Sequence, residues 1–395
     1  MTPAAVPPPR SPLHQRLRMR TGYHWRNSGN PVLTHARTVW DTRDRAGFPA
    51  VRSEAGGLSV SYAGLAEGLA YTLEFTELRR DADLHRTERR TGRLSGADLA
   101  VPGRLPDADI VMVGTSAARA RALPRVSSLV VPMRVHFVID FDPDDPDRAR
   151  RLISKRERWQ FRRDLREHTW TWGLDRDPAA FDRFYDRFYR PTMFQRHGSR
   201  ERTESKEVSY ECLFRGGRMF FLAEDGVRIG GALCHWDRAS RTLTLRLLGV
   251  LDGAQEHYDS GAFKAVYHFL IDWCARHDVR RLDFQGTEPF LSKGTYQWKR
   301  RFGTTVILPP NHFGDKRLWF QVRHDTPQVR DFLVANPLLA ERPDGALEAV
   351  YFHDDRRAPR LDYSARSPGV AAVREVDLDT FLAGAPRPSP GRALS

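Results

Sequence analysis

The sequence predicts an α/β (α+β) protein in which mixed, mostly antiparallel sheets are flanked by helices. In the C-terminal half, runs that alternate with a period of two are interleaved with runs of helical period, and turn signals separate them. In the N-terminal half, short β-rich runs are mixed with loops. The chain has 395 residues, of which 40% are hydrophobic. This is enough for about two to three packed domains and excludes a wholly disordered chain.

Charge and cysteine content narrow the class of protein further. The 63 Lys and Arg residues exceed the 50 Asp and Glu residues by 13, which favours polyanionic partners such as nucleic acid. Only three cysteines occur, widely spaced, so no disulfide framework is expected. The N-terminus has no apolar signal region, and the longest apolar run, residues 127–141, is too short and too charged to span a bilayer. We therefore expect a soluble cytoplasmic protein.

The N-terminal part predicts an arm followed by strands. Residues 1–35 are Pro-rich and basic without a hydrophobic period, which predicts a flexible arm. Alternatively, its Arg16, Arg18 and Arg20 could grasp phosphates. Three β-like runs follow, and the third is interrupted by a proline; they are residues 69–78, 109–114 and 126–141.

A strongly basic stretch occupies residues 148–172, with eight Arg and one Lys against three acidic residues. Arg151, Lys155, Arg158 and Arg162 are spaced by four, three and four, which predicts that they share one face of a helix. Such a face could bind phosphates, or it could simply be solvated. Four aromatic side chains lie among or just after these charges and could stack on a base, although core packing is the alternative; they are Trp159, Phe161, Trp170 and Trp172.

The remaining elements follow in a regular order. A helix opened by Asp177-Pro178 carries an apolar stripe of core type, formed by Phe181, Phe184, Tyr185 and Phe188. Three strands connected by tight turns come next, then a long helix, a strand, a short basic helix and a last strand. Their expected positions are residues 218–224, 227–236, 242–251, 262–277 and 281–285, with the last two elements between 287 and 310.

This order of three antiparallel strands, a helix, a strand, a helix and a strand resembles the core of the GNAT acyltransferase fold. The resemblance is sharper in residues 282–286 (LDFQG) and 296–303 (YQWKRRFG), which are similar to the closing motif of Fem-type aminoacyltransferases. That motif has an Asp-Phe-Gly strand end and a later Lys-x-x-Phe-Gly. The matching residues are Asp283, Phe284, Gly286, Lys299, Phe302 and Gly303; Gln285 departs from the motif by separating Phe284 from Gly286. Residues 154–167 resemble the basic helix that opens the second of the family's two tandem domains.

The resemblance implies tandem GNAT-like domains. Residues 36–147 would form a degenerate first domain, 148–320 the catalytic domain, and 321–395 a partly disordered C-terminal extension. The implied activity is transfer of an aminoacyl group from aminoacyl-tRNA to an amine of a small molecule or peptide, which forms an amide. Neither a tightly bound cofactor nor a metal is expected.

Two alternatives remain open at this stage. The first is a GNAT N-acyltransferase that uses acyl-CoA. The usual Arg/Gln-x-x-Gly-x-Gly/Ala loop, whose N–H groups hold the CoA pyrophosphate, is missing between Leu251 and Ala262, which argues against this donor. The second alternative is a non-catalytic nucleic-acid-binding module derived from the same fold.

The candidate site residues follow from the chemistry and the resemblance. Acyl transfer to an amine passes through a tetrahedral oxyanion that a fixed cation stabilises. By resemblance Lys299 is this cation, and Asp283 is a candidate base or orienting group; their alternatives are a solvated basic helix face and a structural cap. Further substrate-binding candidates are Arg196, Tyr258, Ser260, Gly261, Gln285, Tyr296, Trp298 and Phe302. The N–H groups at Ser260 and Gly261 could bind an anion.

Overall fold

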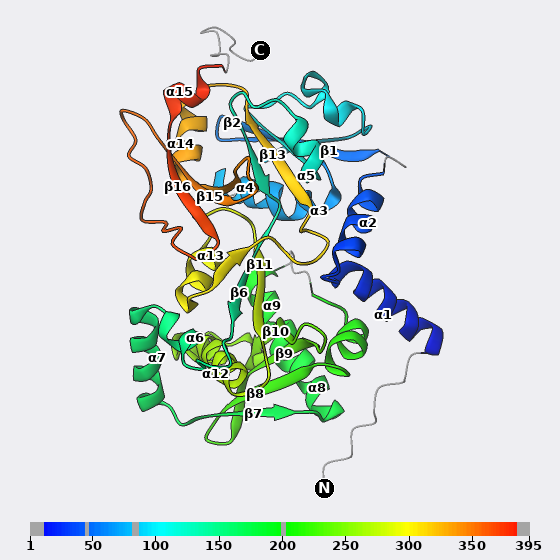
Figure 1. Cartoon of the computed structure of the whole chain (residues 1–395), viewed down its shortest axis with the longest axis vertical. Coiled ribbons are helices and arrows are strands. Elements are labelled where there is room, and N and C mark those ends of the chain that lie inside the picture. The colour runs from blue at the N-terminus through cyan, green and yellow to red at the C-terminus, as the bar shows by residue number, and fades with distance from the viewer. Residues whose placement is uncertain (1–11, 44–46, 81–86, 199–202, 385–395) are drawn as a thin grey trace. The chain divides into compact units, whose positions relative to one another are not determined.

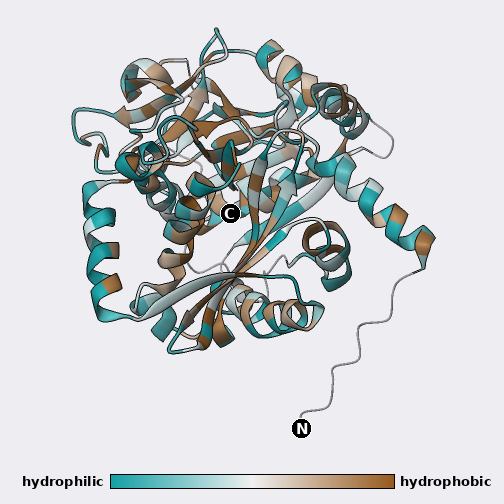
Figure 2. Ribbon diagram, turned by 60° about the horizontal axis from the view of Figure 1, so that its bottom comes forward, coloured by the Kyte–Doolittle hydropathy of each residue, from teal (hydrophilic) through white to brown (hydrophobic). Residues whose placement is uncertain are grey.

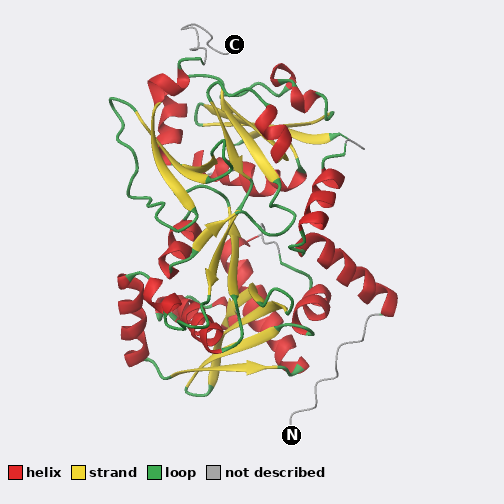
Figure 3. Ribbon diagram, viewed as in Figure 1, coloured by secondary structure: helices red, strands yellow, loops and turns green. Residues whose placement is uncertain are grey.

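The computed structural model describes residues 12–43, 47–80, 87–198 and 203–384. The chain divides into two compact units, each assembled from separate stretches of sequence. The first unit comprises Met1–Arg26, Phe137–Gln285 and Arg301–Thr305; the second comprises Asn27–His136, Gly286–Arg300 and Val306–Ser395. Figures 1 and 3 show the predicted combination of mixed, mostly antiparallel sheets with helices, so the predicted fold class is confirmed.

A seven-stranded sheet, with the order β12-β6-β11-β10-β9-β8-β7, is the framework of the first unit. Strands β7 to β10 pair antiparallel in succession, whereas β10 and β11 are parallel. The strands are β6 (Val135–Asp140), β7 (Trp170–Asp175), β8 (Arg218–Glu224), β9 (Val227–Asp237), β10 (Thr242–Val250), β11 (Arg281–Thr287) and β12 (Thr305–Ile307). The predicted strands of this half are confirmed: β10 alternates with the period of two of a half-buried strand, whereas the middle of β8 and of β9 is buried on both faces.

Helices accompany this sheet. They are α1 (Leu13–Asn27), α6 (Arg148–Leu152), α7 (Lys155–Glu167), α8 (Pro178–Phe184), α9 (Arg190–His197), α10 (Lys206–Val208), α11 (Glu256–Asp259) and α12 (Ala262–Arg276). Asp177 caps α8, since its carboxylate accepts a hydrogen bond from the Ala179 N–H at 3.0 Å. The aromatic stripe that begins on α8 is buried in an aromatic cluster, as its helical spacing predicted.

A six-stranded sheet with the order β3-β1-β2-β4-β13-β5 is the framework of the second unit, and a three-stranded sheet, β14-β15-β16, belongs to the same unit. The strands are β1 (Phe48–Ala55), β2 (Leu58–Gly64), β3 (Glu88–Leu94), β4 (Ile110–Ser116), β5 (Ser128–Pro132), β13 (Lys316–Val322), β14 (Leu338–Glu341), β15 (Leu347–His353) and β16 (Val370–Asp377). The helices are α2 (Pro31–Asp41), α3 (Ala66–Gly68), α4 (Glu74–Arg80), α5 (Ala117–Ala122), α13 (Gly294–Lys299), α14 (Pro327–Ala335) and α15 (Leu378–Leu382).

The predicted domain boundaries differ from these units at both ends of the chain. Strand β13 lies between β4 and β5, so residues beyond 315 complete the sheet of the N-terminal half. Residues of α14, β15 and α15 belong to the same hydrophobic core, and the predicted extension 321–395 is therefore folded as far as residue 384. The predicted flexible arm 1–35 is wrong where it overlaps α1 and α2, because these residues are helical. Residues 1–11 and 385–395 lie outside the described part of the chain.

The predicted strand at residues 69–78 is also wrong. A π-helical turn, Leu69–Leu73, continues into α4 there. Alternating apolar residues produced the prediction, but the buried side chains include the polar Thr72, Thr76 and Glu77. Hydrophobic alternation therefore misidentified the buried face.

A buried lysine ties α2 and α3 to the sheet of the second unit. Lys316 at the start of β13 has no exposed surface, and its Nζ lies 2.7 Å from Asp41 Oδ2 and 2.8 Å from Glu67 Oε1. Burial raises the pKa of the Asp41 carboxyl, but Lys316 and Arg37 lower it by more, so the net pKa is below its ordinary value. An ammonium buried this deeply requires both carboxylates as partners.

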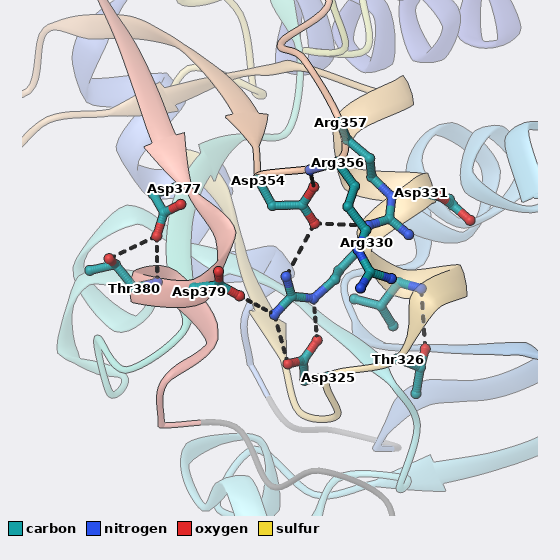
Figure 4. Close-up of polar contacts among 11 residues, drawn as sticks. Asp325, Thr326, Arg330, Asp331, Asp354, Arg356, Arg357, Asp377, Asp379 and Thr380 are labelled. Carbon is teal, nitrogen blue, oxygen red and sulfur yellow. Dashed lines mark hydrogen bonds and ion pairs between the residues drawn. The ribbon is translucent and has the colours of Figure 1, made fainter.

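An arginine network ties α14, α15 and the end of β15 together (Figure 4). The Arg330 guanidinium contacts Asp325 at 2.6 Å, Asp354 at 3.1 Å and Asp379 at 2.7 Å. Arg357 adds a second contact to Asp354 at 2.8 Å. These contacts explain why the C-terminal stretch is an integral part of the second unit.

Among the described residues, no helix is both long and apolar enough to cross a membrane.

Replacing the buried lysine should destabilise the second unit. We expect Lys316→Met to lower the free energy of unfolding by about 3 kcal/mol, because two carboxylates lose their common buried partner. Urea denaturation measures this, with Lys155→Met, at an exposed position of α7, as the control. A loss below about 1 kcal/mol, the size typical of an exposed pair, would contradict a structural role for this cluster.

Candidate functional site

The basic stretch at residues 148–172 folds as two helices rather than one. Helix α6 ends at Leu152, and Ser154 caps α7 by accepting a hydrogen bond from the Glu157 N–H at 3.3 Å. Arg151 therefore lies on α6, whereas Lys155, Arg158 and Arg162 lie on α7. The prediction of one shared helix face is wrong for Arg151, because the Ser cap starts a new helix between them.

One face of α7 is buried against α12. The Phe161 ring stacks on His268 with a centroid distance of 4.0 Å. The buried Glu157 carboxylate lies 3.7 Å from His268 Nε2 and 3.6 Å from Lys264 Nζ. Burial raises the pKa of Glu157, but His268 and Lys264 lower it by more, so this carboxylate keeps its charge in the interior. These contacts fix the rotation of α7 about its own axis.

The same buried face places a carboxylate at the start of α12. Gly261, just before this helix, has a φ of +85°, and a Cβ there would lie 2.7 Å from Asp164 Oδ2. Asp164 is buried, and its Oδ1 accepts a hydrogen bond from Gln160 at 2.8 Å. The prediction that Ser260 and Gly261 bind an external anion is thus corrected, because Asp164 lies where the helix N-terminus favours negative charge. Ser260 Oγ accepts a hydrogen bond from the Ala262 N–H at 3.4 Å.

The opposite face of α7 is basic and exposed. Lys155, Trp159, Arg162 and Arg166 follow one another at spacings of four, three and four, which puts them in one stripe along the helix. We call these four residues the α7 stripe. No ion pair joins Lys155, Arg162 or Arg166 to an acidic residue in the described part of the chain, whereas Arg163 beside them contacts Asp164 and Glu167, each at 3.5 Å. In Figure 2 α7, the helix at the left, is drawn mostly in the teal of hydrophilic residues.

The arginines of α6 behave differently. Arg150 contacts Asp272 at 2.8 Å, Arg148 lies 3.7 Å from Asp142, and Arg151 pairs with Asp145. Acidic partners compensate the charges of these three arginines, although their side chains are exposed. The predicted phosphate-binding set therefore changes: Arg158 is half-buried, and Arg166, which the sequence analysis omitted, joins the stripe. Its position four residues after Arg162 was the available signal.

The four aromatic candidates differ in how far they are exposed. The Trp159 side chain is 55% exposed, while Phe161 and Trp170 are buried. Trp172 stacks on Phe220 and Phe269, with centroid distances of 5.1 and 5.7 Å. Core packing, the alternative stated for this group, applies to all of them except Trp159.

Arg196 and Tyr258 come together at the first turn of α12. The Arg196 guanidinium lies 5.1 Å from the Phe263 ring centre, and Tyr258 packs on the same ring at 5.0 Å. The Tyr258 hydroxyl is buried and has no hydrogen-bond partner among the described residues. These two predicted substrate-binding residues are thus neighbours, since both pack on the Phe263 ring.

Gln285 has a structural role. Its φ is +59°, its Nε2 donates to the Leu245 carbonyl at 2.5 Å, and its N–H donates to Asp283 Oδ1 at 2.6 Å. The pairing of β10 with β11 ends at Thr244 and Asp283, and β10 changes register between residues 245 and 247. The side chain of Gln285 therefore bridges the two strands where their pairing stops, and its role in substrate binding stays a prediction.

The Lys-x-x-Phe-Gly segment is more buried than a solvated helix would be. Lys299 ends α13 and is only 6% exposed, so the alternative of a solvated basic face is wrong for this residue. Tyr296 is fully buried, and burial raises the pKa of its hydroxyl, whereas Trp298 is half-buried. Lys299 belongs to the second unit, and Asp283, also buried, belongs to the first.

Phe302 is a core residue of the first unit. Its ring lies 5.5 Å from that of Tyr267 and 5.1 Å from that of His268, and it has no exposed surface. The prediction that it binds substrate is corrected, since the aromatic position of the motif fills the interior behind α12. Among the described residues, no group of three or more His, Cys, Asp or Glu residues is placed to hold a metal.

The contact between α7 and α12 should make the first unit sensitive to acid. Burial lowers the pKa of His268 below its ordinary 6.5 more than Glu157 raises it, so the folded protein holds this imidazole neutral. The unfolded chain binds the proton first as pH falls below about 6.5, so stability decreases from that point. Between pH 7.5 and 5.5 the free energy of unfolding should fall by about 1 kcal/mol less in His268→Gln than in the unmodified protein. Urea unfolding at the two pH values measures this difference. An unchanged pH dependence would contradict this assignment.

No protein-family model matches this sequence, and no curated protein matches it. Solved structures that align with the chain include L-PGS from Bacillus licheniformis, with 11% identity over 81% of this chain and 95% of that chain and a TM-score of 0.37. The C-terminal domain of a putative lysylphosphatidylglycerol synthetase from Agrobacterium fabrum aligns with 11% identity over 78% and 91%, with a TM-score of 0.35. A tandem GNAT protein from the clavulanic acid biosynthesis pathway aligns with 12% identity over 78% and 93%, with a TM-score of 0.28. All three TM-scores are below 0.5, so the function of this chain has to be argued from its own residues.

Proposed function

We propose that this chain is a GNAT-type N-acyltransferase that takes an aminoacyl group from aminoacyl-tRNA and passes it to an amine of a small molecule or peptide. The observation that supports the tRNA donor is the α7 stripe, whose three cations have no acidic partner among the described residues. The fold class and the Lys-x-x-Phe-Gly resemblance support the transferase chemistry.

Electrostatics favour a polyanion on this surface. Lys155 and Arg166 are eleven residues apart, which places the ends of the stripe about 16 Å apart along the helix axis. Cations held in a row release counterions when they neutralise successive phosphates, and this release drives nucleic-acid binding. Because α7 is fixed on α12, little ordering entropy opposes the contact.

The chemistry proposed is a balanced acyl transfer. The acceptor amine attacks the ester carbonyl of aminoacyl-tRNA, the C–N bond forms, and the C–O bond to the terminal ribose breaks. Lys299 stabilises the tetrahedral oxyanion, and the proton that the amine loses passes to solvent. The departing ribose oxygen takes up a proton, so tRNA leaves with a free hydroxyl.

Acyl-CoA remains the competing donor. Two observations disfavour it: the pyrophosphate loop is missing before α12, and the Asp164 carboxylate lies at the start of that helix. Mass spectrometry of the copurifying species separates the donors. Bound tRNA that carries one dominant amino acid and is released by high salt would support the proposal, whereas bound acyl-CoA without RNA would overturn it.

Neutralising the α7 stripe should weaken RNA binding in a salt-dependent way. We expect the triple variant Lys155→Gln, Arg162→Gln, Arg166→Gln to bind tRNA more than tenfold more weakly at low salt. The magnitude of the slope of log K for tRNA binding against log salt concentration should fall by about 2. Three phosphate contacts are lost, and each contact to a single strand releases about 0.7 of a counterion. Filter binding over a salt series measures both quantities.

Helix α6 offers a matched control for this experiment. The triple variant Arg148→Gln, Arg150→Gln, Arg151→Gln removes the same charge from side chains that are 60%, 56% and 59% exposed but paired. Its tRNA affinity should stay within about threefold of the unmodified protein, because these charges are already compensated. Equal losses in the two variants would mean that only net charge matters and that the stripe is no binding site.

Lys299 should matter for turnover and not for RNA binding. We expect Lys299→Met to reduce release of a radiolabelled amino acid from charged tRNA to mixed amines by about 100- to 1000-fold, the usual effect of losing an oxyanion donor. Its tRNA affinity should be unchanged, and its thermal unfolding is compared with that of Lys299→Arg to control for folding. Full turnover in a folded Lys299→Met protein would remove this residue from the mechanism.

A further inference from the structure

We infer that the α7 stripe binds RNA at an unpaired nucleotide whose base stacks on the indole of Trp159. This inference rests on the proposed function, since it specifies which part of an RNA the same surface recognises. It goes beyond charge, because the cations alone do not distinguish a duplex from a single strand.

The position of Trp159 supports this inference. It lies one turn after Lys155 and one turn before Arg162, in the middle of the stripe, with 55% of its side chain exposed. The Arg163 guanidinium lies 5.8 Å from the ring centre. No other aromatic ring of the described residues packs on this indole. A large apolar ring is therefore held in water between cations that would track a phosphate backbone.

The buried face of α7 shows that folding does not need this side chain. Glu157, Phe161 and Asp164 make the contacts to α12, and Trp159 lies on the other side of the helix. An exposed indole gains free energy when a flat, polarisable group covers it, and every nucleobase offers such a face.

A single-stranded partner fits better than a duplex. In double-stranded RNA the bases are stacked inside the helix, and a side chain on a convex surface reaches mainly phosphates and sugars. An unpaired base can turn outward and stack while the phosphates on either side meet Lys155 and Arg162. This combination of cations and an aromatic platform is typical of single-strand binding.

A membrane surface fits less well. Interfacial helices insert a broad apolar face, whereas Phe161 of α7 is buried against α12 and the exposed Leu165 lies about 120° around the helix axis from Trp159. Trp159 is the single large apolar residue of the stripe, so little area is available to enter a bilayer. We therefore assign the surface to RNA and use vesicles as an outcome of the test.

The test measures fluorescence anisotropy of full-length protein with a labelled oligouridylate of about 12 nucleotides and with a duplex of the same length. We expect Trp159→Ala to weaken binding of the single strand by about 5- to 30-fold and to change duplex binding by less than twofold. Trp159→Phe should restore most of the single-strand affinity, because it keeps an aromatic face. Arg162→Gln should weaken the binding of both the single strand and the duplex.

Leu165→Ala is the matched control. Leu165 is also an exposed apolar residue of α7, at 40%, and lies about 120° around the helix axis from Trp159. Its removal should leave both affinities unchanged. Thermal unfolding of each variant confirms that the exposed substitutions do not affect folding.

The outcomes separate this inference from the proposed function. If the unmodified protein binds neither RNA, the tRNA donor fails and the stacking inference fails with it. If it binds RNA and Trp159→Ala weakens the single strand and the duplex equally, or neither, the inference is overturned while the donor proposal stands. Trp159-dependent binding to vesicles of equal parts phosphatidylglycerol and phosphatidylcholine, without Trp159-dependent RNA binding, would assign the surface to a membrane instead.

Discussion

The organisation of α7 depends on how the buried carboxylate of Glu157 is compensated. A charge in the interior is tolerated only when opposite charges or hydrogen-bond donors surround it. The Lys264 ammonium of α12 supplies the opposite charge at 3.6 Å, and the neutral His268 imidazole lies beside the carboxylate and stacks on Phe161. Asp164, two turns after Glu157, meets the start of the same helix through the space that Gly261 leaves open. Together they hold α7 in one rotation, and Lys155, Trp159, Arg162 and Arg166 are consequently exposed.

The rotation of α7 about its axis exposes the basic side chains of the α7 stripe. The chain is rich in arginine throughout, and many of the described arginines pair with carboxylates nearby or across the fold. Arg330 and Arg357 share Asp354 in the second unit, and Arg150 reaches Asp272 in the first. The cations of the α7 stripe, in contrast to these three arginines, have no acidic partner among the described residues. Charge pairing, more than charge number, separates structural arginines from those available to a partner.

Much of the fold was predictable because it is encoded locally. The strands from 218 to 250 and the helix from 262 follow from periodicity and turn residues, and the structure has them within one or two residues. Residues 69–78 failed because alternation of apolar residues also occurs by chance in a helix whose buried face includes threonines. The domain boundaries failed for a different reason: β13 pairs with β4 and β5 from two hundred residues earlier, and no local pattern reports such a pairing.

The candidate site shows the same division. The sequence by itself determined the order of strands and helices from β8 to β11, the basic character of residues 148–172 and the Lys-x-x-Phe-Gly resemblance. Only the tertiary structure decided that Phe302 and Gln285 serve the framework and that Trp159 is exposed while Trp170 is buried. The physical reason is that a side chain's exposure and charge compensation depend on partners distant in sequence. Arg150 and Asp272 are 122 positions apart, and only folding brings them within 2.8 Å.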